Sequence, residues 1–220
     1  MKKTIITALV LLALIVAVFY FKKQSTNTTN NLATTTPQTA TSTSDSEIST
    51  PGFDYVNATS SDPNLITPSI THDIVFGPTF NLQTKSDLMK QVSQTKDALR
   101  ANNQNYDAWI DLANEASSAG DLTYAVEILN FLIARLPASA LPHHNLGMLY
   151  GYYLKESKLA TVELRKAIDL EPLITYWYIE LYQYYRDTDL KDKAVSVLQE
   201  AVSKKVPNYQ DLQKLIDLLK

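Results

Sequence analysis

Three histidines, His72, His143 and His144, are the side chains of this sequence best suited to metal binding or proton transfer. A shared metal site would need two of them to point at one ion. His143 and His144 are neighbours, and neighbouring side chains on a helix point about 100° apart, so they would not chelate one metal easily. The sequence therefore predicts no metal site.

The remaining residues form none of the usual catalytic patterns. The chain has no cysteine, which excludes disulfides, thiolate metal sites and cysteine nucleophiles. Its glycines form neither a P-loop nor a dinucleotide-binding fingerprint, and no Gly-x-Ser-x-Gly elbow occurs. Asp187 and Asp189 fall at a predicted turn, where we expect caps. We expect no enzymatic activity, no cofactor and no small-molecule substrate.

Tyrosine is the residue type that indicates binding. Aromatic side chains crowd two predicted helices so closely that some rings must stay exposed, as they do on binding surfaces. They are Tyr150, Tyr152, Tyr153, Tyr176, Trp177, Tyr178, Tyr182, Tyr184 and Tyr185. The nearly balanced charge, −3 overall, argues against a nucleic-acid partner, which would require clustered basic residues.

A predicted transmembrane anchor occupies residues 1–23. Residues 4–21 carry no charge and, as a helix, would span roughly 27 Å, close to the hydrocarbon thickness of a bilayer. The alternative is a cleaved signal peptide, but the apolar run ends in Phe21-Lys22-Lys23 where small residues would mark a cleavage site. We expect a retained signal anchor, with its N-terminus in the cytoplasm and the following domain outside it.

Two segments of different composition follow the anchor. Residues 24–61 are rich in Ser and Thr, which predicts a disordered linker. Residues 62–84 carry scattered apolar side chains, but Pro63, Pro68 and Pro78 exclude a helix through them. This pattern fits a short strand-turn-strand, an extended segment on a helical domain, or plain linker.

The elements that must position the aromatic residues repeat along the chain. Leu112, Leu146 and Leu181 are spaced by 34 and 35 residues, and alanines 125, 160 and 194 by 35 and 34. In each unit the leucine marks a first helix, and the alanine lets a second helix approach closely. The second unit has one extra residue, which we place in its inter-helix turn. The sequence predicts an all-α, right-handed solenoid of about three helix-turn-helix repeats over residues 85–220.

Capping and covering residues complete this domain. Asp121 is the predicted N-cap of one second helix, and Ser157 and Asp189 occupy the corresponding places. A helix over residues 86–101 and a last helix after Asn208 are expected to cover the two ends of the stack. We expect the domain to fold alone, without a stability contribution from the preceding linker.

These units resemble the tetratricopeptide repeat (TPR) family, over residues 105–207. The family pattern is a Trp, a Leu-Gly pair and a Tyr in the first helix, then a small Ala, a Phe or Leu, another Ala and a Pro in the second. The corresponding residues are Trp109, Leu112-Ala113, Ala116, Ala125, Leu129, Leu132 and Pro137; Leu146-Gly147, Tyr150, Ala160, Leu164, Ala167 and Pro172; and Tyr178, Leu181-Tyr182, Tyr185, Ala194, Leu198 and Ala201. Tyr182 departs from the pattern, since it replaces the small glycine. His143 stands at an aromatic position, which implies packing, while His144 faces solvent or a groove.

The resemblance implies a concave groove lined by the first helices. Asn114 and Asn145 match positions where some members hold a bound peptide, although both amides would be solvated in the alternative interpretation. Ile110, Tyr176 and Glu180 replace the basic clamp that binds chaperone tails, so an apolar or aromatic segment is the expected ligand. The predicted partner-binding residues are Asn114, Asn145, Met148, Tyr152, Tyr176, Gln183 and Arg186.

The predicted function is that of a membrane-tethered adaptor that binds partner peptides or domains, in envelope assembly or protein quality control. The layout is similar to that of single-pass proteins of the bacterial cytoplasmic membrane whose repeat domain lies outside the cytoplasm. Two alternatives remain at this point: a glycan-binding module that uses the Tyr-rich face, and a self-associating structural scaffold.

Overall fold

The computed structural model describes residues 66–78, 80 and 82–219 of the chain. They belong to one compact unit of the chain. The predicted anchor, residues 1–23, and the predicted linker, residues 24–61, lie outside the described residues. Within the described ranges, no helix combines the length and the apolar character needed to cross a bilayer.

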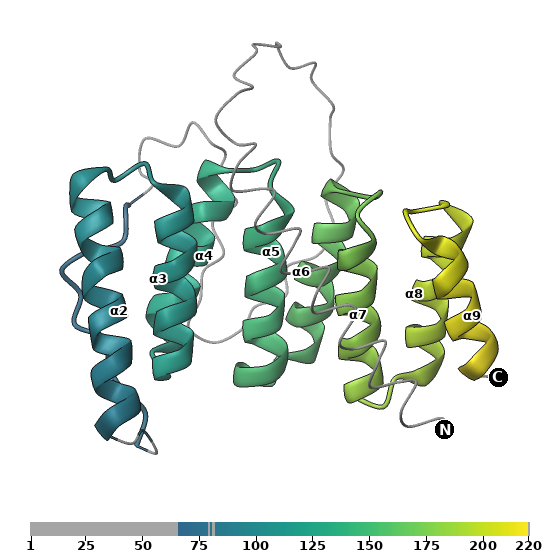
Figure 1. Cartoon of the computed structure of the whole chain (residues 1–220), viewed down its shortest axis with the longest axis horizontal. Helices are drawn as coiled ribbons and strands as arrows, with labels where there is room; N and C mark the ends of the chain where they lie inside the picture. The colour runs from purple at the N-terminus through teal and green to yellow at the C-terminus, as the bar shows by residue number, and fades with distance from the viewer. Residues whose placement is uncertain (1–65, 79, 81, 220) are drawn as a thin grey trace, which may run out of the picture. The chain divides into compact units, whose positions relative to one another are not determined.

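All regular structure in the described part is helical, and consecutive helices pack side by side along the chain (Figure 1). The elements are α2 (Leu82–Ala101), α3 (Tyr106–Ala119), α4 (Leu122–Arg135), α5 (Ala140–Met148), the π-helical segment η1 (Leu149–Leu154), α6 (Ser157–Leu170), α7 (Thr175–Asp187), α8 (Lys191–Ser203) and α9 (Tyr209–Leu219). Three pairs, α3 with α4, α5–η1 with α6, and α7 with α8, correspond to the predicted repeats. The predicted all-helical fold is confirmed.

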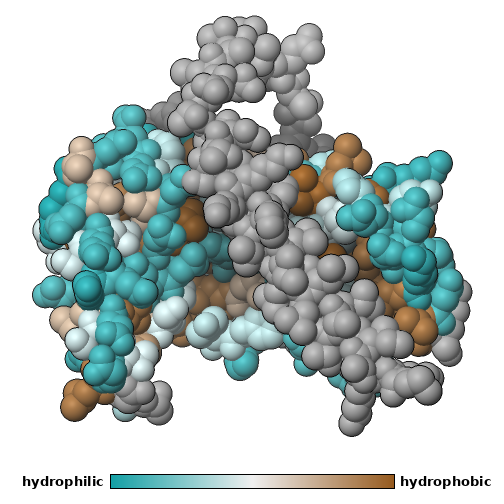
Figure 2. All heavy atoms as spheres, in the orientation of Figure 1, coloured by the Kyte–Doolittle hydropathy of each residue, from teal (hydrophilic) through white to brown (hydrophobic). Residues whose placement is uncertain are grey.

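The landmarks of the repeat form the core between the paired helices. The first-helix leucines 112, 146 and 181 are at most 1% exposed, and the second-helix alanines 125, 160 and 194 at most 3%. The outermost helices α2 and α9 bury only one face, as covers of a repeat stack must. Figure 2 shows mainly hydrophilic residues on the surface over α2 and over α8 and α9.

The second pair is the most closely packed part of the core. A Cβ atom at Gly147 would lie 2.7 Å from Cγ of Leu164 and 3.0 Å from the Leu164 backbone nitrogen. A Cβ atom at Gly151 would lie 2.5 Å from Cε2 of Tyr184 and 3.2 Å from Cβ of Ala160. Glycine is therefore required at both positions by the approach of α6 and α7.

The prediction that the extra residue of the second unit lies in its inter-helix turn is wrong. The residue lies in the first helix of that unit. Residues Leu149–Leu154 form a π-helical end to the first helix of this pair. The Glu156 N–H closes this end by donating to the Tyr150 C=O at 2.8 Å. A π-helical segment absorbs an inserted residue by widening the helix, so that the contacts on either side keep their register.

Deleting Tyr153 is expected to preserve the fold, because it would shorten the interval between Leu146 and Ala160 to the thirteen residues that separate Leu112 from Ala125. We expect a free-energy change of unfolding below about 2 kcal/mol, the range of tolerated changes. Deleting Asn114, an exposed residue in the middle of α3, is the matched control and should disrupt the register of the first pair. Urea denaturation that finds the two deletions equally harmful would contradict this account of η1.

The turn of the first pair has the predicted cap, and the later turns differ from the prediction. Gly120 ends α3 with a left-handed φ of 94°, which favours glycine, and the Asp121 side chain accepts from the Tyr124 N–H at the start of α4. Ser157 is the first residue of α6, with Glu156 before it, and Asp189 adopts φ 59° and precedes Leu190. Neither makes a side-chain cap, because the π-helical end and the left-handed Asp189 shift the helix starts.

Residues 69–78, before α2, pack on the first helix pair, and for these residues the extended-segment interpretation is the one observed. We call residues 69–78 the strap. Its His72 Nε2 lies 2.8 Å from Asp121 Oδ2, and its Val75 N–H donates to the same oxygen at 2.9 Å. Further along, the Gly77 N–H donates to the Ala119 C=O at 2.8 Å. The strap therefore crosses the turn between α3 and α4.

Two further helices hold the strap in place. The Tyr124 hydroxyl donates to the Ser69 C=O at 2.6 Å, and the Lys96 ammonium of α2 donates to the His72 C=O. The expectation that the helices receive no stability from this segment is at odds with these bonds, since each would be lost with the strap. In addition, α2 begins at Leu82, four residues before the predicted Ser86, because no proline lies between Pro78 and Ser86.

Candidate binding groove

The first helices α3 and α5–η1 enclose a hollow of about 550 Å³. Its walls combine amides and hydroxyls from α3 and α5 with apolar and aromatic side chains from α5 and η1. The lining residues are Asn114, Ser117, Ser118, His144, Asn145, Met148, Leu149, Tyr152 and Tyr153. Four of the seven predicted binding residues, namely Asn114, Asn145, Met148 and Tyr152, therefore share one cavity.

The two predicted amides meet across the hollow. The Asn145 amide donates from Nδ2 to Asn114 Oδ1 at 3.3 Å, which joins α5 to α3. Asn114 is exposed and Asn145 half-buried, so the pair lies at the surface of the hollow with hydrogen-bonding capacity left over.

The histidines beneath the surface face different partners. His143 Nδ1 lies 2.7 Å from Glu163 Oε2 on α6, and its buried position is the predicted packing role. His144 Nδ1 lies 3.1 Å from Asn145 Oδ1, and its Nε2 lies 3.4 Å from Glu180 Oε2 on α7. His144 is thus part of the groove wall, and within the described residues no group of His, Asp and Glu is arranged to hold a metal ion.

The far wall of the hollow connects to α7 through Tyr152. Its hydroxyl donates to Asp187 Oδ2 at 3.0 Å, while Arg186 donates to Asp187 Oδ1 at 2.8 Å. Burial, together with the Asp187 hydrogen bond, raises the pKa of Tyr152 above its usual range. The Arg186 guanidinium also lies over the Tyr182 ring at 5.8 Å. The predicted residue Arg186 therefore supports the wall of the hollow from outside.

The two remaining predicted residues, Tyr176 and Gln183, lie on α7 beyond the hollow. Tyr176 is half-buried and packs its ring 5.5 Å from that of His144, so it touches the groove through one intervening side chain. Gln183 is half-buried on the same helix. The structure thus brings four predicted residues together and leaves three on the neighbouring first helix.

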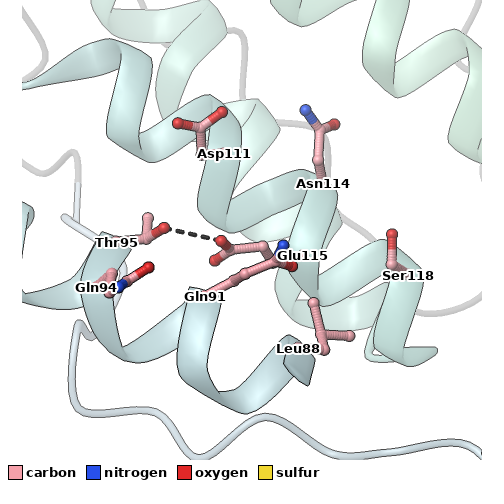
Figure 3. A pocket seen from close by; sticks show the side chains of 8 residues that line it. All are labelled: Leu88, Gln91, Gln94, Thr95, Asp111, Asn114, Glu115 and Ser118. Atoms are coloured by element: carbon pink, nitrogen blue, oxygen red, sulfur yellow. Dashed lines mark hydrogen bonds between the residues drawn. The ribbon is translucent and has the colours of Figure 1, made fainter. Parts of the chain in front are cut away.

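A second, acidic hollow continues the groove between α2 and α3, and Asn114 belongs to both. Figure 3 shows Asp111, Asn114 and Ser118 projecting from one face of α3, with glutamines 91 and 94 on the facing helix. Glu115 Oε1 accepts from the Thr95 hydroxyl at 2.8 Å, while its Oε2 is buried without a hydrogen-bond partner. Burial raises the pKa of both Asp111 and Glu115 above their usual range.

Most of the tyrosines that are crowded on the first helices of the second and third pairs belong to the core. Tyr150, Tyr178, Tyr182, Tyr184 and Tyr185 are at most 7% exposed. Only Tyr152, Tyr153 and Tyr176 of the crowded runs keep accessible rings, and Tyr153 is 53% exposed. This division agrees with the expectation that most rings pack and a few stay exposed.

His144, Leu149 and Tyr153 line the hollow but were not among the predicted binding residues. A helix-spacing argument finds His144, because it precedes Met148 by four residues and Tyr152 by eight, on one helix face. Tyr153 has no such signal, since the π-helical segment alters the direction of its side chain.

Comparison with known proteins adds one structural likeness. The sequence matches no protein-family profile and no curated protein. Among solved structures it is similar to the crystal structure of MamA, with 23% sequence identity over 64% of this chain and 83% of that chain, and a TM-score of 0.46. This likeness does not place the chain in a family, so the assignment of helix pairs rests on the packing described above.

Proposed function

We propose that this chain is a membrane-tethered adaptor that binds segments or domains of other proteins in the groove along α3, α5 and α7. The observation that carries the proposal is the hollow in which Asn114 and Asn145 meet beside Met148 and Tyr152. An amide both donates and accepts, as a peptide backbone requires, and a thioether and an aromatic ring accommodate apolar side chains. This combination suits a peptide ligand and calls for no catalytic step.

The walls of the groove also constrain the chemistry of the partner segment. One end of the groove carries the Tyr152 and Tyr153 rings, and the other carries Asp111 and Glu115. A segment that passes Asn114 would therefore present apolar or aromatic side chains toward η1 and neutral or basic ones toward α2. A partner with acidic groups at that second end is disfavoured by like-charge repulsion.

The membrane tether in this proposal rests on composition alone. Residues 4–21 would cross the lipid bilayer, and residues 24–61 would give the domain a flexible reach from the surface. The domain would then meet its partners outside the cytoplasm, in envelope assembly or protein quality control.

Replacing both amides is the direct test of the groove. A photo-reactive amino acid at the exposed position 153 would first identify the partner by cross-linking in the native cell. Asn114→Ala combined with Asn145→Ala should then weaken binding of that partner by about 10-fold or more, since two hydrogen bonds of about 1 kcal/mol each are lost. Titration calorimetry of the purified pair would measure the change.

Asn130→Ala is the matched control, because Asn130 is half-buried on α4, a second helix that lines neither hollow. It should leave the affinity unchanged. Equal affinities for the double variant and the original chain, with unchanged circular dichroism, would move the binding site away from this groove.

A further inference from the structure

Four polar side chains from three helices form one continuous line under and across the groove. Glu180 of α7 faces Nε2 of His144, whose Nδ1 faces Oδ1 of Asn145. The Nδ2 of Asn145 in turn donates to Oδ1 of Asn114 on α3. His144 is only 7% exposed, so bulk water does not readily replace these partners.

Both ring nitrogens of His144 lie opposite oxygen atoms, so two N–H donors are needed where neutral imidazole has one. A carboxylate oxygen and an amide oxygen can only accept, so both ring nitrogens of His144 face acceptors. Neutral imidazole carries a single N–H, whereas the observed arrangement needs two. A second N–H on the ring, or a proton on Glu180, would complete this line, because these two groups share the contact at Nε2.

Loss of that proton reverses the order of the amides. Nε2 would keep its N–H toward Glu180, and Nδ1 would become an acceptor. Asn145 would then turn its amide to donate from Nδ2 to His144, and its Oδ1 would face Asn114. Asn114 would turn as well, to donate from Nδ2. The Asn114 atom that remains free to bind a ligand would then be the acceptor Oδ1 and no longer the donor Nδ2.

We propose that the protonation state of His144 sets the hydrogen-bonding polarity of the groove, with His144 as the positioning residue of Asn145 and Asn114. The protonated form offers an amide donor to a backbone carbonyl of a partner, and the neutral form offers an acceptor to a backbone N–H. That this polarity selects partners rests on the proposed function. The coupling of His144 to Asn145 and Asn114 does not depend on it.

The surroundings of His144 leave its pair with Glu180 as the group that changes charge. From α7, Tyr176 also faces it, and burial, with Glu180 nearby, raises the pKa of that hydroxyl above its usual range, so it stays neutral. Across the hollow, η1 contributes Tyr152 and Tyr153, and α3 contributes Asn114, Ser117 and Ser118. On its other side Asn114 also borders Asp111 and Glu115 of α3, whose own titration would move the Asn114 signal in His144→Gln as well. His143 of α5 is paired with Glu163 of α6. The charged residues of α4, Glu127 and Arg135, are exposed.

Nitrogen-15 NMR of the full chain tests the coupling without any partner. The sequence contains only three histidines, so the His144 ring signals can be assigned by comparison with His144→Gln. We expect the side-chain NH₂ signals of Asn114 and Asn145 to shift with pH at the same midpoint as the His144 ring. In His144→Gln the amide signals of Asn145 should no longer follow pH in that range.

Two further variants keep the test decisive if His144→Gln folds poorly. Glu180→Gln removes the carboxylate that faces Nε2 of His144 and should move the midpoint at which the two amide signals change. His143→Gln removes the neighbouring, separately paired imidazole and should leave the amide titration unchanged. Amide signals that stay constant while His144 titrates, or a midpoint that does not move in Glu180→Gln, would overturn the proposal. Neither result depends on whether the double asparagine variant loses its partner.

Discussion

Ala160→Trp is expected to unfold the second helix pair and to cost at least about 3 kcal/mol, the upper part of the range for overpacked cores. Ala160 is fully buried, and its Cβ lies 3.2 Å from the place that a Cβ of Gly151 would occupy. Tyr184 closes the same space from α7, so an indole has no direction in which to extend. Urea denaturation of the full chain, followed by circular dichroism, would measure the loss.

Val162→Trp on the same helix is the control for Ala160→Trp. Val162 is 60% exposed, so tryptophan there should change the free energy of unfolding by about 0.5 kcal/mol or less. If the two variants unfold at the same urea concentration, the close approach of α6 to α5 and α7 is not what limits side-chain size at residue 160.

Asp121→Ala is expected to release the strap and to cost about 2–4 kcal/mol, the sum of a lost N-cap and the partly buried Val75 N–H left without an acceptor. The carboxylate of Asp121 is 8% exposed and accepts from the Tyr124 N–H, the Val75 N–H and His72. Asp121→Asn keeps an oxygen for the cap and should lose less. Thermal unfolding would rank the three proteins.

Hydrogen exchange separates release of the strap from loss of the cap alone. In Asp121→Ala the backbone amides of Val75 and Gly77 should exchange much faster than in the original chain. The control is Asp192→Ala, an exposed residue in the first turn of α8, which should leave both amides protected. Slow exchange at Val75 and Gly77 in Asp121→Ala would show that other contacts hold the strap.

The periodic part of the fold was predictable because its energetics are local and repeated. A leucine and an alanine that recur every 34 or 35 residues must bury themselves against the same kind of neighbour, so the helix pairs follow from the spacing alone. The strap has no such period. Its place depends on hydrogen bonds between residues far apart in sequence, such as Val75 and Asp121, and scattered apolar residues between prolines do not indicate which helix they meet.

The candidate groove was predictable to a similar degree. Asn145, Met148 and Tyr152 lie three and four residues apart, which places them on one helix face, and Asn114 holds the place of Met148 in the preceding repeat, 34 residues earlier. The contact of His144 with Glu180, 36 residues away, depends on how far α7 leans toward α5. Such a lean is set by side-chain volumes, for example those of Gly151 and Tyr184, and no spacing rule supplies it.

The strap also determines where a mechanical load on this chain would act. The strap is bound to the turn between α3 and α4. Residues 78–119 therefore form a loop whose two ends are joined by the Gly77–Ala119 hydrogen bond and by the bonds of the strap to Asp121. A pull from the N-terminal side would therefore reach the first repeat through Asp121 and Ala119, and it would reach α2 only through the Lys96 bond to the His72 C=O. The backbone that leads into α2 would carry tension only after these bonds had broken, and the groove wall on α3 would stay in place until then.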